Sequence, residues 1–187
     1  RAGNVPILIG TSVMLGLLLV WVIGGHIARG LQAGHRQRVS QRYRSLIDAL
    51  AHKSRAPKAV RALIDVPAKH REIVAEDLLA LLRVTGGATV THARKAAHGM
   101  GLVREWKAAL ESRYWWRRAE AARALGCVQE SSAVLGLMGR LDDRHEEVRA
   151  AAVEALGRLR DARALAPLVE GLWDDSGLQH TRVVLAI

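Results

Sequence analysis

Residues 118–126 read Arg-Ala-Glu-Ala-Ala-Arg-Ala-Leu-Gly, and residues 149–157, which lie 31 positions later, read Arg-Ala-Ala-Ala-Val-Glu-Ala-Leu-Gly. Both blocks are rich in helix-forming residues, so each predicts a helix. An acidic turn follows each block, because Leu141-Asp142-Asp143 returns as Trp173-Asp174-Asp175 after 32 positions. The alanines allow paired helices to pack closely, and one such unit cannot bury a core alone. The sequence therefore predicts stacked helical repeats.

The predicted helix ends carry capping residues. Gly126 and Gly157 are expected to end the first helix of each unit in the left-handed conformation that glycine tolerates. Ser131 and Asp161 are expected to cap the second helices. Pro167 is acceptable in the first turn of a helix. Each unit is thus predicted as a helix, a glycine stop, a second helix and an acidic turn.

Upstream of these blocks, apolar residues recur at three- and four-residue steps, which predicts further helices. One is expected over residues 39–51, with a break at 54–57. A short segment around residues 60–64 and a stronger helix with Leu78 and Leu82 on one side follow, the latter ending at Gly86-Gly87. No segment after residue 28 shows sustained period-two alternation, so the predicted fold class is all-α.

The second block resembles the short bacterial HEAT repeats found in proteins related to phycobilin lyases, whose signature is Val-Arg-x-x-Ala-x-x-Ala-Leu-Gly followed by Asp-x-x-Ala and a leucine-rich helix. The resemblance is carried by Val148-Arg149, Ala152, Ala155-Leu156-Gly157, Asp161, Ala164 and Leu168. It implies a short α-solenoid of HEAT-like helix pairs over residues 72–187, clearest at 114–143 and 145–175. It also implies a curved surface that holds a partner protein. Because residues 180–187 look like the first helix of another unit, we expect the array to be cut short after Ile187.

Residues 2–28 contain no Asp, Glu, Lys or Arg, and nearly every position from Val5 to Ile27 is apolar. As a helix, this stretch would be roughly 30 Å long, which matches the hydrocarbon core of a bilayer. Residues 1–28 are therefore predicted to form a single transmembrane anchor. A cleaved signal peptide is the alternative, although the apolar core is longer than its usual hydrophobic region. Ser12 and Gly16 lie four apart and are small, so they predict a packing face for oligomers within the membrane.

The net charge of +10 is concentrated next to this anchor. Residues 29–71, a predicted basic helical segment, hold eleven basic and two acidic residues, whereas residues 72–187 hold sixteen of each. The positive-inside rule places the N-terminus outside and the repeats in the cytoplasm of a bacterium, at its inner membrane. The residues expected to face the anionic inner leaflet are Arg29, Arg36, Arg38, Arg42 and Arg44.

The alternative for these arginines is a topology signal without a specific ligand. A nucleic-acid-binding protein would carry its excess positive charge on the folded domain. Because the predicted repeat domain is neutral, nucleic acid is not an expected partner.

One patch of the repeats combines large aromatic and basic side chains: Tyr114, Trp115, Trp116, Arg117 and Arg118. Adjacent tryptophans on a helix point in different directions, so one ring is expected to pack between repeats while the other is exposed. Because Trp and Arg are enriched at binding hot spots, this patch is the candidate site for a protein partner of unidentified nature. The alternative is that the rings fill space left by small alanines, as expected for Trp106 and Trp173.

No catalytic, cofactor-binding or metal-binding residue is predicted. HEAT-like hydroxylases with a di-iron centre need several His-Glu pairs, and this sequence has one, His145-Glu146, which falls at an expected helix start. Cys127 stands among small apolar residues and is expected to be a buried structural thiol. We therefore expect a non-enzyme, a membrane-anchored scaffold or adaptor for protein–protein interaction. The alternatives are a non-catalytic subunit of a larger membrane enzyme complex and a lyase-like HEAT enzyme.

Overall fold

The computed structural model describes residues 14, 18, 19, 21, 34–166 and 168. Every regular element among these residues is a helix, as predicted. The chain divides into two units, residues 1–42 and 43–187, and residues 34–42 of the first unit are helical. Within the described part, no helix is both long and apolar enough to cross a membrane. The span predicted at residues 1–28, including Ser12 and Gly16, lies outside the described residues except for four positions.

The second unit begins with four helical segments, of which the first three match the predicted pattern. Residues 43–49 are helical, and the helices that follow are α2 (Ala56–Ile64), α3 (Ala68–Val84) and α4 (Ala88–Gly99). The break predicted at 54–57 lies earlier, at residues 50–55, because Pro57 sits in the first turn of α2, where its missing N–H costs nothing. The predicted stop after α3 is confirmed, with Gly87 in a positive-φ conformation (φ 63°).

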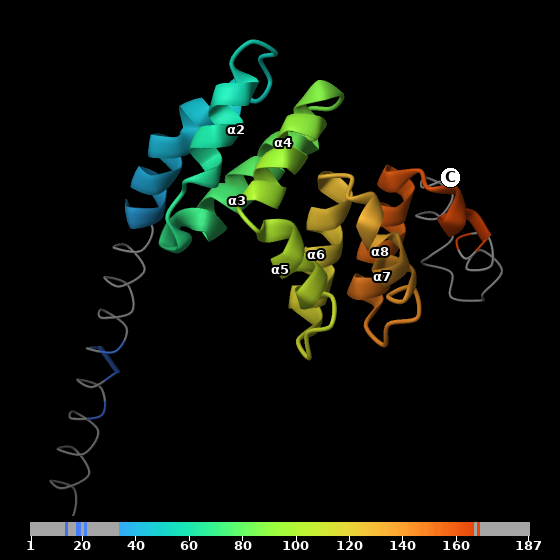
Figure 1. The fold of residues 1–187 in the computed structure, drawn as a ribbon. Helices are drawn as coiled ribbons and strands as arrows, with labels where there is room; N and C mark the ends of the chain where they lie inside the picture. Colours follow the sequence, from blue (N-terminus) through green and yellow to red (C-terminus); the bar gives the residue numbers. More distant parts are fainter. Residues whose placement is uncertain (1–13, 15–17, 20, 22–33, 167, 169–187) are drawn as a thin grey trace, which may run out of the picture. The chain divides into compact units, whose positions relative to one another are not determined.

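The repeats follow directly. Their elements are α5 (Leu102–Ala109), α6 (Trp115–Cys127), η1 (Ser131–Ala133), α7 (Val134–Met138), α8 (Glu146–Leu159) and η2 (Ala162–Ala164). Helix α5 lies against α6, α6 against α8, and α7 against α8 (Figure 1). The first helices of the two predicted repeats are therefore direct neighbours.

The prediction that Gly126 and Gly157 end their helices in the left-handed conformation is wrong. Both glycines lie inside helices, and the left-handed positions fall three residues later, at Gln129 (φ 52°) and Arg160 (φ 49°). Gly126 is required for packing instead: a Cβ atom there would lie 2.6 Å from the Cα of Ala155 on α8. The sequence pattern was right about a special glycine but wrong about its physical role.

One of the two predicted caps is also displaced. Asp161 caps η2 as expected, because its Oδ1 accepts a hydrogen bond from the N–H of Arg163 at 3.0 Å. The other cap is Glu130 and not Ser131, since Glu130 Oε1 accepts from the N–H of Ser132 at 3.3 Å. Glu130 and Asp161 are 31 positions apart, so both repeats use a carboxylate, and not a hydroxyl group, to cap the second helix.

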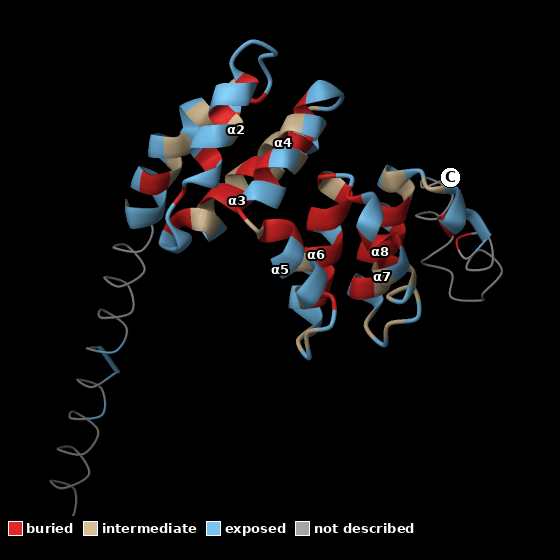
Figure 2. Cartoon of the chain, in the orientation of Figure 1, coloured by how far each residue is buried: buried red, intermediate tan, exposed pale blue. Residues whose placement is uncertain are grey.

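The core runs through the second unit and consists of leucine, valine and many alanines. Buried positions are dense on α6 and α8, where alanines on both helices permit close contact (Figure 2). Cys127 at the end of α6 is half-buried, and burial raises the pKa of its thiol. The Nη1 of Arg158 on α8 donates to its sulfur at 2.8 Å. Trp106 is half-buried against the core, whereas Trp173 lies outside the described residues.

Candidate partner-binding surface

The aromatic patch predicted from sequence lies where α6 and α8 begin. Tyr114 precedes α6 with an extended backbone (φ −90°, ψ 119°), and His145 precedes α8 in nearly the same conformation (φ −99°, ψ 125°). The two residues are 31 positions apart, which is the repeat spacing. The repeat therefore places an aromatic ring at the same corner of two neighbouring units.

Four aromatic rings contact one another in series across these two units. Trp115 stacks on His145, with ring centroids 5.7 Å apart and planes 24° apart. Trp116 meets Trp115 edge-on at 6.2 Å and lies 4.6 Å from Tyr114. Aromatic pairs at such separations attract each other by about 0.5–1.5 kcal/mol beyond the burial of their surface. We call Tyr114, Trp115, Trp116 and His145 the aromatic edge.

Two arginines lie over one ring of the aromatic edge. The guanidinium carbon of Arg113 is 4.6 Å from the centroid of Tyr114, and that of Arg117 is 6.0 Å from it. Arg113 Nη2 also donates a hydrogen bond to the Tyr114 hydroxyl. Arg113 was not singled out in the sequence, although its position next to Tyr114 would have been the signal. Both cations bring positive charge to an apolar surface.

Both tryptophans retain surface in contact with solvent. Trp116 is 50% exposed and Trp115 is 37% exposed. Trp115 contacts the start of the following repeat through His145, whereas Trp116 contacts Tyr114 in the turn before its own helix. The two rings therefore leave α6 in different directions, and each presents part of its face to the outside.

Arg118, by contrast, belongs to the interior, and its inclusion in the binding patch needs correction. Its Nε and Nη2 each donate to a carboxylate oxygen of Asp143 at 2.7 Å, and its Nη1 donates to the carbonyl oxygen of Ser112 at 2.8 Å. The side chains of Arg118 and Asp143 are both 6% exposed. A paired guanidinium at this depth offers a partner almost no surface. Arg118 instead fastens the turn before α6 to the turn before α8.

The ion pair also positions the aromatic edge. Asp143 Oδ1 accepts a second hydrogen bond, from the N–H of His145 at 3.0 Å. The hydrogen bonds from Arg118 are the main cause that lowers the pKa of the Asp143 carboxyl, and they raise the pKa of Arg118. Since His145 carries the ring on which Trp115 stacks, the pair holds the two ends of that contact in place.

The same arrangement begins again one repeat later. Arg149 lies 31 positions after Arg118, and its Nη1 donates to the carbonyl oxygen of Asp143 at 2.9 Å. Asp143 in turn lies 31 positions after Ser112, the acceptor for Arg118. Both repeats therefore contain an arginine whose side chain donates a hydrogen bond to the backbone carbonyl oxygen six residues before it.

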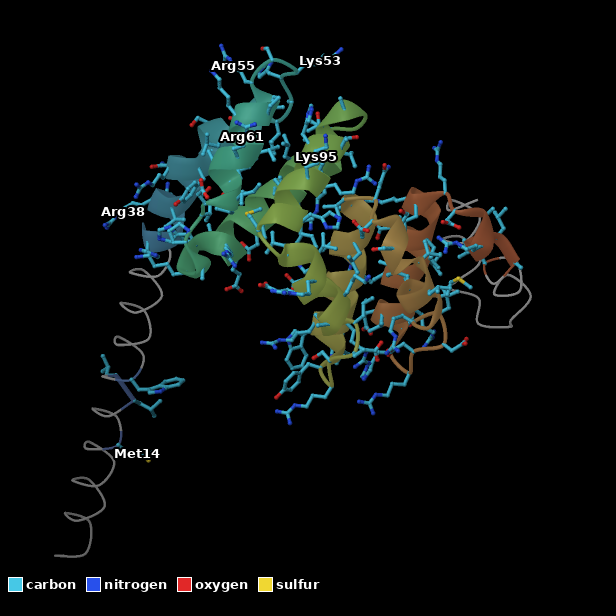
Figure 3. All side chains as sticks on the ribbon, viewed as in Figure 1. Met14, Arg38, Lys53, Arg55, Arg61 and Lys95 are labelled. Atoms are coloured by element: carbon cyan, nitrogen blue, oxygen red, sulfur yellow. The ribbon has the colours of Figure 1, made fainter. Side chains whose placement is uncertain are left out.

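The remaining predicted site residues are placed as follows. Arg36, Arg38, Arg42 and Arg44 are exposed on a helical segment, while Arg29, Ser12 and Gly16 lie outside the described residues. Figure 3 shows further cations, Lys53, Arg55 and Arg61, projecting from the turn before α2 and from α2 itself. His145 and Glu146 lie at the start of α8, as predicted. Among the described residues, no group of three or more His, Cys, Asp or Glu side chains is placed to hold a metal ion.

Comparison with known families supports the repeat interpretation. Residues 103–185 match the family model for HEAT repeats. This match covers both predicted repeats, 114–143 and 145–175, together with α5 from its second residue onward. HEAT repeats generally mediate protein–protein interaction. No curated protein matches the chain.

Proposed function

We propose that this chain is a scaffold whose HEAT repeats hold a partner protein at the aromatic edge. The observation that carries the proposal is the half-exposed ring of Trp116, which contacts Trp115 and Tyr114. Two arginines lie over the ring of Tyr114. Aromatic rings and arginines are enriched at the hot spots of protein interfaces. Aromatic rings bury much area with few rotatable bonds, and a guanidinium offers five hydrogen-bond donors in a fixed plane. The proposed role is non-enzymatic.

The scaffold is further proposed to be anchored in a bacterial inner membrane, with the N-terminus outside and the repeats in the cytoplasm. The uncharged stretch at residues 2–28 supports an anchor. Met14, Leu18 and Trp21 are helical, recur at steps of four and three, and are each more than half exposed. Such an apolar row is costly in water and favourable in lipid. Ser12 and Gly16 are the proposed contact for a second copy of the span.

The partner site is tested by affinity capture from detergent-solubilised membranes, with the bound proteins quantified. The test variant is Trp116→Ala, which removes an exposed ring without opening the core. The matched control is Leu135→Ala, which removes a 69% exposed leucine of α7 that lies outside the aromatic edge. We expect a stoichiometric partner to be retained by the native chain and by Leu135→Ala, and lost from Trp116→Ala. Equal retention by both variants would place the partner site elsewhere.

The anchor is tested separately by fusing reporters to the C-terminus. A fluorescent protein that folds only in the cytoplasm should be active, and an alkaline phosphatase that needs the periplasm should be inactive. Alkaline extraction of membranes should leave the chain in the pellet. Release into the supernatant, or the opposite reporter pattern, would contradict the proposed anchor or its orientation. Neither result depends on the partner experiment.

A further inference from the structure

A pocket of about 470 Å³ lies where α3, α4 and α5 meet. Arg71 of α3 forms one side, the turn Gly99-Met100-Gly101 and His98 form a second, and Val103 and Arg104 of α5 form the third. None of these residues belongs to the aromatic edge. The pocket is large enough for a small polar group and its immediate substituents.

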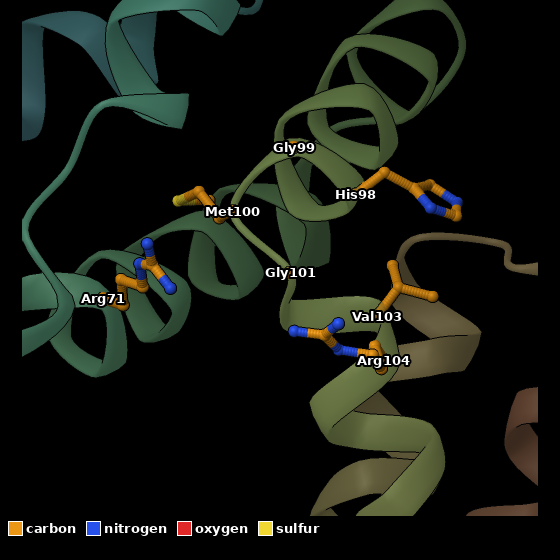
Figure 4. Close-up of a pocket in the computed structure, with 7 residues that line it drawn as sticks. All are labelled: Arg71, His98, Gly99, Met100, Gly101, Val103 and Arg104. Atoms are coloured by element: carbon orange, nitrogen blue, oxygen red, sulfur yellow. The ribbon is translucent and has the colours of Figure 1, made fainter.

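Two guanidinium groups extend toward the same space in this pocket (Figure 4). Arg71 is half-buried, and its Nε donates only a long hydrogen bond, 3.4 Å, to the carbonyl oxygen of Val66. Its two terminal nitrogens make no hydrogen bond to any residue that the structure describes. Arg104 forms no ion pair with any other described residue, and no carboxylate lines the pocket. Arg104 is exposed. The two like charges repel each other, and an anion bound between them would offset that repulsion.

The backbone adds positive potential to the same place. Gly101, with φ of 80°, turns the chain from α4 into α5, and a Cβ atom at this residue would lie 4.0 Å from Arg104 Nη2. Val103 lies in the first turn of α5, where N–H groups have no acceptor within the helix. Helix starts of this kind favour negative charge. Glu105 lies in the same turn but does not line the pocket.

His98 lines the pocket, but its side chain is engaged by Glu130 and does not face the two arginines. Its ring points away from the two arginines (Figure 4), and its Nε2 is 2.6 Å from Glu130 Oε2. Burial alone would raise the pKa of Glu130, but hydrogen bonds from Ser132 and His98 outweigh it and lower that pKa. Because Glu130 is thus an acceptor, His98 is the donor in this contact. The pocket keeps its two arginines as the cationic groups.

We propose that this pocket binds a phosphate monoester group. The guanidinium fork donates two parallel hydrogen bonds to oxygens of a planar or tetrahedral oxyanion, and two forks match the double charge of a phosphate monoester better than a carboxylate. The ligand carrying this group is either a soluble phosphate compound or a phosphatidate headgroup, and the second source rests on the proposed membrane anchor. Both sources share the same chemistry at the pocket.

The proposal is tested by calorimetric titration of the full chain in a neutral detergent. The three probes are inorganic phosphate, dihexanoyl phosphatidate below its micellar concentration, and dihexanoyl phosphatidylcholine, which lacks a monoester. The test variants are Arg71→Gln, Arg104→Gln and their combination. The matched control is Arg123→Gln, which neutralises an exposed arginine of α6 outside the pocket.

We expect saturable binding of phosphate, of phosphatidate, or of both, and the probe that binds identifies the source of the ligand. Each single substitution should weaken binding about tenfold or more, and the double variant should abolish it. Arg123→Gln should bind like the native chain. Absence of saturable binding to both inorganic phosphate and phosphatidate, equal binding of phosphatidylcholine, or unchanged affinity in the double variant would each overturn the proposal. All variants should show the same helical circular dichroism as the native chain.

Discussion

Gly126 of α6 lies against Ala155 of α8 so closely that an added methyl group would stand 2.6 Å from the Cα and 2.8 Å from the Cβ of Ala155. This contact joins the first helices of the two repeats. Because real Cβ atoms do not approach backbone carbon to this distance, the spacing of α6 and α8 depends on the absence of a side chain at position 126.

Gly126→Ala is expected to destabilise the repeats. In a solvated helix this change would stabilise by up to about 1 kcal/mol, but here the methyl group meets backbone that cannot swing away. Overpacking of this kind costs about 1–3 kcal/mol. Urea unfolding followed by circular dichroism measures the difference. Gly139→Ala is the control, because a Cβ there would lie 3.6 Å from its nearest neighbour and should cost little. A native-like midpoint for Gly126→Ala would show that α6 and α8 pack less closely than described.

Arg118→Met is expected to cost about 3 kcal/mol of unfolding free energy, because it leaves Asp143 buried without its partner. Replacing both members, as Arg118→Met with Asp143→Leu, should recover part of the loss, since no charge is then stranded. The neighbouring exposed Arg117→Met should change stability by less than about 0.5 kcal/mol. A double-mutant cycle by urea unfolding gives the coupling energy. A coupling near zero would mean that the pair does not fasten the two turns.

The same pair predicts a pH dependence. The pKa of Asp143 is lower in the folded chain than its ordinary value of 3.8, so the pair contributes fully above that value. As the pH falls below 3.8, the unfolded chain takes up the proton first, and the contribution is lost until the folded pKa is passed. The stability gap between the native chain and Asp143→Asn should therefore be constant from pH 7 to 5 and shrink below pH 4. If the difference in unfolding free energy between the two chains widened at low pH, the pKa of Asp143 would be raised in the folded chain, which would contradict the ion pair.

Gln129→Gly is expected to stabilise the chain. Gln129 has a φ of 52°, and a residue with a Cβ is strained in this conformation whereas glycine is not. The hydrogen bond from Arg94 Nη1 to Gln129 uses the backbone oxygen at 2.8 Å, so the substitution keeps it. We expect a gain of about 0.5–1 kcal/mol in urea unfolding. Ser131→Gly, at a residue with negative φ, should instead destabilise, and a loss at both positions would argue against the left-handed turn.

Much of the fold could be predicted from local pattern. The helix that ends before Gly86-Gly87 and the start of α8 at Glu146 follow from apolar spacing, a glycine stop and an acidic first turn. The 31-residue spacing predicted the repeat, and the match of residues 103–185 to HEAT repeats confirms it. Such signals can be recognised in a sequence because helix propensity, helix capping and apolar periodicity act over a few neighbouring residues.

Only part of the candidate site could be predicted from the sequence. The cluster of Tyr114, Trp115 and Trp116 stands out in sequence because its members are consecutive. The contact of Trp115 with His145 joins residues 30 positions apart, and the burial of Arg118 depends on Asp143, which is 25 positions away. Neither distance has a local signature. Adjacent aromatic and basic residues therefore looked like one patch, although one of the arginines faces inward.

The sequence by itself determined that this chain is helical and repetitive, because those properties follow from the residue types at each position and their periodic spacing. Only the tertiary structure decided what the repeated residues do. It made Gly126 a packing residue and not a cap, since its neighbour Ala155 comes from another helix. It buried Arg118 in an ion pair with Asp143, and it brought Arg71 and Arg104 to one pocket. The packing of separate helices decides which distant side chains meet and which of them lose contact with water.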